Sequence, residues 1–251
     1  MNTVTTALGV FGILAVAVLL GRGIRCRLPE HHLNADTRDT VKLAAGLVAT
    51  MTALLLGLLV NSAKSAYDTE RSEVIQMAAE VTFLDHLLKL YGPPTAEARS
   101  QLRAAVENAA SQLWPGDKHG SPQLAPETPE GNALYFAIQQ LSPQDDTQRS
   151  LKAQAIAVAI ELAQMRSLLQ AQSASSVYKP LVVMVVCWLV VILLGFSLVA
   201  PPNATATLAL LTSAFAASGA IFLILELDRP FDGLIQISNQ PIINALNYLP
   251  K

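Results

Sequence analysis

The chain has 251 residues, of which 52% are hydrophobic and 14% are charged, whereas soluble globular domains carry charge at about a quarter of their positions. Its formal net charge of -2 excludes a nucleic-acid partner drawn to a basic surface. Four stretches, residues 5–20, 43–60, 180–200 and 203–225, contain no Asp, Glu, Lys, Arg or His. A helix needs about 17–25 apolar residues to cross a bilayer, so the sequence predicts an all-α membrane protein with four transmembrane helices.

The first predicted span, residues 5–21, is expected to stay in the protein as a membrane anchor. No Lys or Arg precedes it, whereas Arg22, Arg25 and Arg27 follow it. A secretory signal peptide has the opposite charge order.

The second predicted span begins near Val41 and continues beyond the membrane as one long helix. No proline or glycine occurs between Gly57 and Gly92, so nothing ends this helix before about Tyr91. Its ~50 residues would extend for roughly 75 Å, more than twice the thickness of the hydrocarbon core. We expect its apolar stripe to pack against the helices of residues 95–178. The stripe consists of Val74, Met77, Val81, Leu84, Leu88 and Tyr91.

Three further helices are predicted in a soluble insert. Capping residues or prolines at the first helical position mark their starts, at Thr95, Thr128-Pro129 and Ser142-Pro143. The predicted ends are Trp114, Leu141 and Tyr178, and residues 115–128 are predicted to form a loop.

The last part of the chain contains the other two spans and a tail. Pro180 marks the entry to the third span, Pro201-Pro202 makes a tight connection to the fourth, and a short helix is predicted near Pro241. The predicted organisation is two spans in residues 1–61, a helical insert in 62–178, two spans in 179–226 and a tail in 227–251.

No residue pattern in the sequence indicates catalysis, a cofactor or a metal site. The chain contains no Ser-His-acid or Cys-His grouping and no glycine-rich phosphate loop. Cys26 and Cys187 are expected at different depths of the bilayer, and no His or carboxylate is spaced to complete a metal site. His31 and His32 are expected to be solvated loop residues. We therefore expect that the protein is not an enzyme and binds no cofactor.

The second predicted span has small or polar side chains along one side, both within the membrane and in the part of the helix that extends beyond it. At about 100° per residue, eight residues fall on this side, roughly opposite the apolar stripe of the extension. They are Leu43, Thr50, Leu54, Gly57, Asn61, Ser65, Asp68 and Ser72.

Two interpretations of this polar side remain open. Small and hydroxyl side chains let membrane helices approach closely, so the side could be a helix–helix interface. Alternatively, copies of the span surround a central axis and line a pore. In that case Leu43 and Leu54 would form apolar rings that gate by dewetting, and Asp68 would concentrate cations at the mouth. Both interpretations require a homo-oligomer.

Two short motifs carry a resemblance to a known family. The segment from Asp228 through Arg229, Pro230, Phe231 and Asp232 to Gly233 follows the last span, and Tyr67-Asp68-x-Glu70-Arg71 lies on the long second helix. With these motifs, the chain resembles the bacterial bestrophin-like membrane proteins, and the order of two spans, a helical insert and two spans extends this resemblance over essentially its whole length.

The resemblance implies a homopentamer that passes inorganic ions across the cell inner membrane. It also implies a pore lined by the second span and a cytosolic helical domain. Bestrophins conduct chloride through a neck with aromatic rings, but the polar side of this span contains no aromatic residue, Lys or Arg. We therefore expect cation conduction here.

The final motif has two interpretations. Pro230 could end the last helix while Gly233 turns the chain and Asp228 and Arg229 are solvated. Alternatively, Glu226 and Asp228 could pair with a basic residue of the insert, such as Lys64 or Arg166.

Membrane orientation and two other functions also stay open. Lys and Arg counts near the span ends are equal on both sides, so the sequence does not orient the chain. The first of these functions is a non-conducting scaffold or sensor, in which the insert would bind a partner. A small-solute transporter would use a path marked by Ser213, Ser218 and Gly219.

Overall fold

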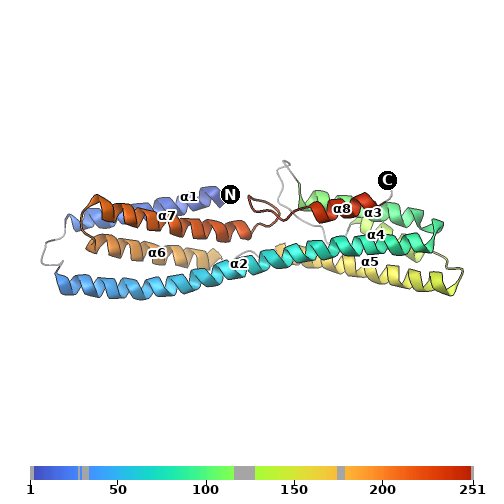
Figure 1. Ribbon diagram of the computed structural model, residues 1–251, viewed down its shortest axis with the longest axis horizontal. Helices are drawn as coiled ribbons and strands as arrows, with labels where there is room; N and C mark the ends of the chain where they lie inside the picture. The colour runs from blue at the N-terminus through green and yellow to red at the C-terminus, as the bar shows by residue number, and fades with distance from the viewer. Residues whose placement is uncertain (1–2, 28, 30–33, 116–127, 174–178, 250–251) are drawn as a thin grey trace. The chain divides into compact units, whose positions relative to one another are not determined.

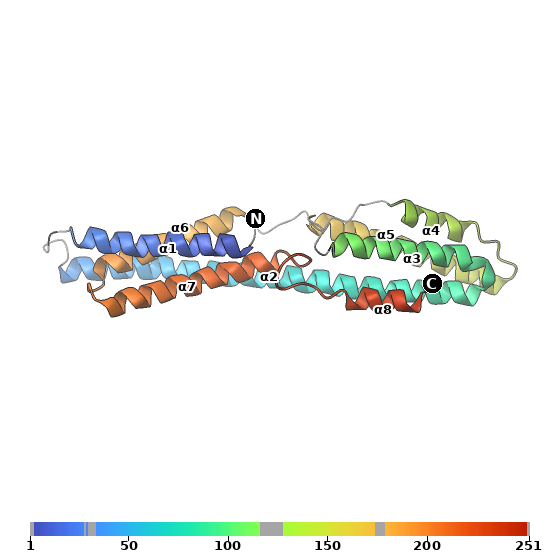
Figure 2. The ribbon, with the colours of Figure 1, turned by 90° about the horizontal axis from the view of Figure 1, so that it is seen from above.

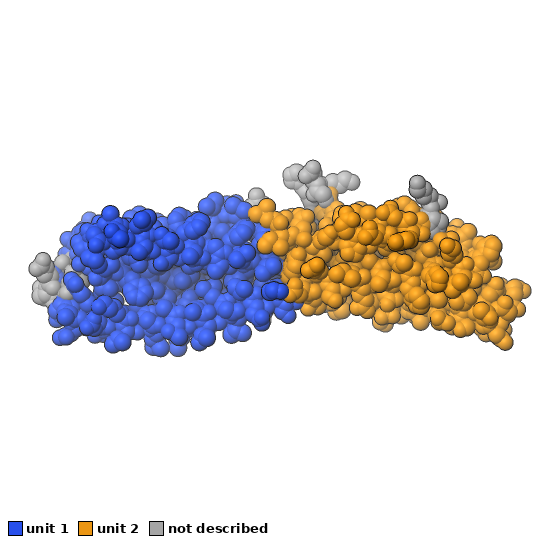
Figure 3. Space-filling model, in the orientation of Figure 1, with its two compact units in different colours: residues 1–66, 176–228 blue, residues 67–175, 229–251 orange. Residues whose placement is uncertain are grey.

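The computed structural model describes residues 3–27, 29, 34–115, 128–173 and 179–249, and every regular element among these residues is a helix (Figures 1 and 2). The chain forms two compact units, which Figure 3 distinguishes by colour. The first unit comprises residues 1–66 and 176–228, and the second comprises residues 67–175 and 229–251.

The first unit contains α1 (Thr3–Arg25), the start of α2 (Ala35–Tyr91), α6 (Lys179–Val199) and α7 (Ala204–Leu227). Each of the four helices has an apolar stretch long enough to cross a membrane, which confirms the four predicted spans. The start of α2 differs from the prediction, because the Asn34 side chain accepts a hydrogen bond from the Thr37 N–H at 2.9 Å. Such a cap stabilises the first turn and lets the helix begin before the apolar stretch.

The core of the first unit forms where α1 packs against α6 and α7. Leu14 and Val18 of α1 are buried in one cluster with Leu193 and Ile221. Two serine hydroxyls also donate to carbonyl oxygens of α1: Ser197 to Val18 at 2.6 Å and Ser218 to Ala7 at 2.7 Å. Small hydroxyl side chains favour such close packing of membrane helices, because they bond across the contact without separating the backbones.

We expect Gly21→Ala to destabilise the first unit by about 1–3 kcal/mol, the usual cost of overpacking. A Cβ atom at Gly21 would lie 2.8 Å from the Ser197 Cβ and 2.9 Å from the Leu194 carbonyl oxygen. Thermal unfolding in detergent should show a lower apparent Tm. Gly12→Ala on the same helix is the control, since a Cβ there meets no atom within 4 Å. Equal apparent Tm values for the two variants would contradict this prediction.

The connection between α6 and α7 is held by the end of α1. The Arg25 guanidinium donates to the Leu198 carbonyl oxygen at 3.1 Å, and Arg22 donates to the Asn203 carbonyl oxygen at 3.2 Å and to the Thr207 hydroxyl. The Asn203 side chain accepts from the Ala206 N–H at 2.8 Å and so caps α7. The tight connection predicted at Pro201-Pro202 is confirmed.

The second unit is built around the remainder of α2. Its other elements are a 3₁₀ turn (Pro93–Thr95), α3 (Ala96–Leu113), α4 (Pro129–Gln139), α5 (Asp146–Ser173) and α8 (Gln240–Tyr248). All six residues of the predicted apolar stripe are buried in one core with side chains of these helices. The predicted end of α2 at Tyr91 and the short tail helix near Pro241 are also confirmed.

Thr95 precedes α3 as predicted but does not cap it. Its hydroxyl donates to the Leu88 and Gly92 carbonyl oxygens, each 2.7 Å away. The hydroxyl therefore bonds to carbonyl groups in the last turn of α2 and just after it, and not to an N–H group at the start of α3. The chain can turn back there because Gly92 has a φ of 114°, a backbone conformation that residues with a Cβ rarely adopt.

The other predicted insert boundaries have mixed outcomes. Thr128 caps α4 by accepting from the Gly131 N–H at 3.2 Å, as its sequence predicted. The prediction that α5 starts at Pro143 is wrong, because the Asp145 carboxylate accepts from the Gln148 N–H at 2.6 Å and caps a helix that starts at Asp146. Most of the predicted loop and the predicted end at Tyr178 lie outside the described residues.

Candidate functional site

One side of α2 is open in the first unit. All six predicted pore-lining residues of this unit are exposed, and Leu43 and Leu54 have exposed fractions of 76% and 68%. The six are Leu43, Thr50, Leu54, Gly57, Asn61 and Ser65. The opposite edge of α2 is buried, with Leu59 and Ala63 packed against Val185 of α6. The helix therefore uses one edge to join its own bundle and leaves the polar side uncovered by it.

The open side is wider than the predicted polar stripe. Leu47, Met51 and Leu58 lie beside the stripe and are also exposed, by 63%, 50% and 66%. In a bilayer, exposed apolar side chains of this kind face lipid or another protein chain. This part of α2 thus offers a largely apolar surface within which Thr50 and Asn61 are polar positions.

At two positions on the open side, no contact with another described helix of the first unit explains the residue found there. The Thr50 hydroxyl donates to the Gly46 carbonyl oxygen at 2.9 Å, so its hydrogen is already used within the helix. A Cβ at Gly57 would meet no atom within 4 Å, so packing among the described residues does not explain the glycine. Both positions could accept close approach by another chain without losing a contact of their own.

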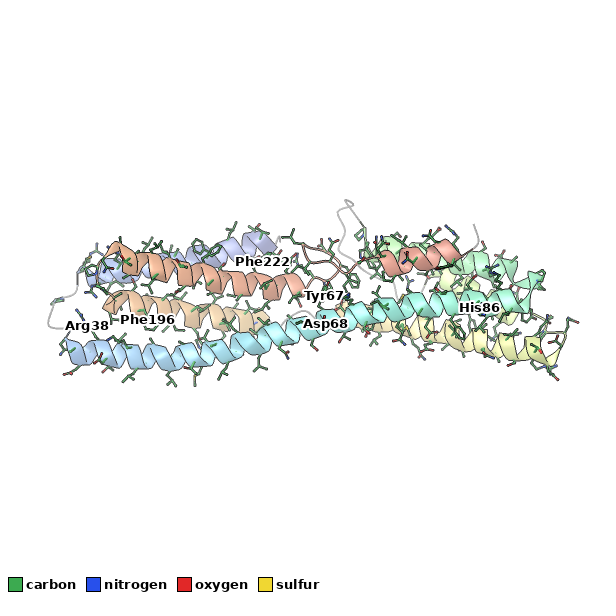
Figure 4. All side chains as sticks on the ribbon, viewed as in Figure 1. Arg38, Tyr67, Asp68, His86, Phe196 and Phe222 are labelled. Atoms are coloured by element: carbon green, nitrogen blue, oxygen red, sulfur yellow. The ribbon has the colours of Figure 1, made fainter. Side chains whose placement is uncertain are left out.

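The second unit contains the last two predicted pore-lining residues, Asp68 and Ser72, and both are exposed. The neighbouring Tyr67 points elsewhere, since it packs on the core of the unit and its hydroxyl lies 3.4 Å from the Gln236 carbonyl oxygen (Figure 4). Consecutive helical residues differ by about 100°, so Asp68 lies on a different side of α2 from the half-buried Tyr67.

The acidic end of α7 has a partner that sequence reasoning missed. Glu226 is completely buried, and its carboxylate accepts a hydrogen bond of 2.6 Å from the Thr3 hydroxyl at the start of α1. A buried carboxylate is tolerated only with such partners. The helix α7 ends at Leu227 with Asp228 as its C-terminal cap residue, so Pro230 lies two residues beyond the cap, where a proline prevents the helix from continuing.

The rest of the motif belongs to the core of the second unit. Phe231 is buried and packs edge-to-face on Trp114, with ring centroids 5.6 Å apart. The Trp114 indole N–H donates to the Ile237 carbonyl oxygen at 2.9 Å, and the Ile237 N–H donates to the Pro230 carbonyl oxygen at 2.7 Å. Arg229 and Asp232 are exposed and Gly233 is half-buried. The apolar Pro-Phe pair between charged residues was the available signal for this anchor.

The serines proposed for a transport path have different surroundings. Ser218 is buried, and its hydroxyl is used in the contact between α7 and α1. Ser213 is exposed and donates to the Ala209 carbonyl oxygen of its own helix at 3.0 Å. Gly219 is exposed too, so the three positions do not share one environment.

Comparisons with known proteins agree with the resemblance. A family model described as a bestrophin-like domain matches residues 12–242. A crystal structure of a single-substitution variant of a bacterial bestrophin homolog from Klebsiella pneumoniae has a TM-score of 0.70 at 16% identity, over 97% of each chain. The structure of a second variant of the same homolog has a TM-score of 0.73 at 15% identity, over 99% of the present chain and 97% of the homolog.

A third structure, of a membrane protein with a single substitution, gives a TM-score of 0.70 at 16% identity over 96% of each chain. No curated protein sequence matches the chain. Identities this low show a shared fold, whereas the family model matches nearly the whole sequence. The chain belongs to the bestrophin-like family.

Proposed function

We propose that the protein is a homopentameric ion channel of the cell inner membrane, rather than an enzyme, and that the open side of α2 lines its central pore. The observation that carries this proposal is the exposure of all eight predicted residues while Leu59 and Ala63 on the opposite edge are buried. Bestrophins are ion channels, so membership of the bestrophin-like family supports conduction.

The side chains on α2 favour a narrow apolar pore with an acidic mouth. Rings of Leu43 and Leu54 would exclude water when closely spaced, and hydrophobic constrictions gate by such dewetting. The open space at Gly57 supports close approach between copies of the helix. Rings of Asp68 carboxylates would concentrate cations, because no Lys or Arg lies on the polar side to oppose them.

Ion flux from liposomes tests the proposal. Purified protein should carry monovalent ions, and reversal potentials under a salt gradient should favour cations. Asp68→Asn should reduce that preference, because each subunit loses one negative charge at the mouth. Glu161→Gln is the charge-matched control, since Glu161 is also exposed but belongs to α5 and not to α2. Flux at the background of empty liposomes, for every ion and voltage, would favour a scaffold or sensor instead.

We further propose that the insert lies in the cytoplasm, as the family resemblance implies. Cys26 is exposed and lies in the loop between the first two spans, on the side of the membrane opposite the insert. In a Cys187→Ser background, a membrane-impermeant maleimide should therefore label Cys26 on intact cells stripped of their outer membrane. Labelling that occurs only after the cells are lysed would place the insert on the outer side.

A further inference from the structure

A cavity of about 710 Å³ lies within the second unit, among α2, α3, α4 and α5. Its volume falls in the range of about 300–1,000 Å³ that is typical of small-molecule sites. Apolar side chains of all four helices form most of the wall, including Val81, Val106 and Leu134. Ile160 and Leu168 also line it and are 43% and 49% exposed, so the cavity opens to the surface beside them.

Among the described residues that line this cavity, Arg166 is the only charged one. Its guanidinium is half-buried, and its Nη2 donates to the Gln112 side-chain oxygen at 3.0 Å. Burial lowers the pKa of Arg166, while the negative charge of Glu130 acts in the opposite direction. An arginine stays protonated under these conditions, so the wall carries a positive charge with reduced hydration.

We propose that this cavity binds an amphipathic monocarboxylic acid, with its hydrocarbon chain on the apolar wall and its carboxylate at Arg166. A guanidinium binds a carboxylate through charge-assisted hydrogen bonds, which strengthen where water is excluded. The same charge disfavours an amine ligand, and the apolar wall disfavours a small hydrophilic anion. Asn132 and Tyr135 line the cavity as well and supply further polar groups. Binding at this site does not depend on whether the protein conducts ions.

Energy transfer from Trp114 provides the assay, because this indole lines the cavity. The chain has two tryptophans, so Trp188→Phe leaves Trp114 as the only donor. The full-length variant in nanodiscs is titrated with a dansyl-labelled undecanoic acid. We expect saturable transfer that dodecanoate reverses at about one tenth of the concentration that dodecanol requires, a ratio typical of one charge-assisted hydrogen bond.

Charge variants test the position of the carboxylate. Arg166→Gln should weaken binding of the labelled acid about tenfold, because it removes the positive charge from the wall. Glu130→Gln should strengthen binding, because it removes the opposing negative charge. Arg149→Gln is the matched control for Arg166→Gln, since Arg149 lies on the same helix, is exposed and does not line the cavity.

A filling variant tests the position of the hydrocarbon chain. Ala163→Phe places a ring in the cavity and should abolish saturable transfer, whereas Ala157→Phe on the exposed face of α5 should not. Ala110→Leu replaces Ala163→Phe if that variant does not elute like its parent in size-exclusion chromatography. Equal transfer in the filling and control variants, or equal displacement by dodecanol and dodecanoate, would overturn the proposal. Absence of transfer in the parent, as when a neighbouring copy fills the cavity, would overturn it too.

Discussion

Leu54→Ala is expected to raise ion flux through the reconstituted protein about tenfold, which corresponds to lowering the barrier to permeation by about 1.4 kcal/mol. Leu54 is 68% exposed on the open side of α2, so every copy would contribute one isobutyl group to the constriction. In the proposed pore, replacing such a ring with methyl groups would widen the passage and let water enter it, and ions would follow the water through the hydrophobic gate.

Leu208→Ala is the matched control for this experiment. Leu208 is also an apolar residue in a transmembrane helix, α7, with a nearly identical exposed fraction of 67%, but it lies off α2. Fluorescent-dye flux and single-channel currents should separate the two variants. If both leave the flux unchanged, or both raise it equally, Leu54 is not in the conduction path and the proposed pore surface is wrong.

Asp85→Ala is expected to destabilise the second unit by about 2–4 kcal/mol, since it removes one partner of a largely buried ion pair. Asp85 is 7% exposed, and its two carboxylate oxygens accept from the Arg99 Nε at 2.7 Å and Nη2 at 3.1 Å. The hydrogen bond to Asp85 raises the pKa of Arg99 despite the opposing effect of burial. Without Asp85, the guanidinium would remain partly desolvated and without this partner.

Urea denaturation followed by Trp114 fluorescence in a Trp188→Phe background measures this loss, because Trp114 belongs to the same unit. Asp146→Ala is the control: its pair with Arg149 is highly exposed, and exposed pairs contribute about 0–1 kcal/mol. Equal urea midpoints for the two aspartate variants would show that the Asp85–Arg99 pair adds nothing to stability.

The long second helix shows which features of the fold could be predicted. Its end at Tyr91 followed from the absence of proline and glycine up to Gly92, and the burial of Val74 and Leu84 followed from helical periodicity. Both signals are local, so they survive in any arrangement of the other helices. The exposure of Thr50 and Asn61 agrees with the predicted polar side, but their role in a pore stays a prediction.

The contacts of the terminal motif could not be predicted in the same way. Glu226 finds its partner in Thr3, which lies 223 residues earlier, and Phe231 packs on Trp114 of the insert. The local sequence around one residue of such a pair does not identify the other residue, because these contacts are set by how the helices pack. Asn34 and Asp145 were missed for a different reason, since their capping role competed with apolar periodicity and proline signals that pointed to other start positions.

Sequence alone therefore determined the number of spans, the helical class, the end of α2 and the residues on each of its sides. All of these depend on hydrocarbon thickness, backbone hydrogen bonding and the 100° step of a helix, which act within one segment. Tertiary structure decided that the edge of α2 at Leu59 is covered and the side at Leu54 is not, that Glu226 is buried, and that Arg166 borders a cavity. These properties arise only when side chains from separate helices compete for the same space, because close packing assigns each side chain its neighbours.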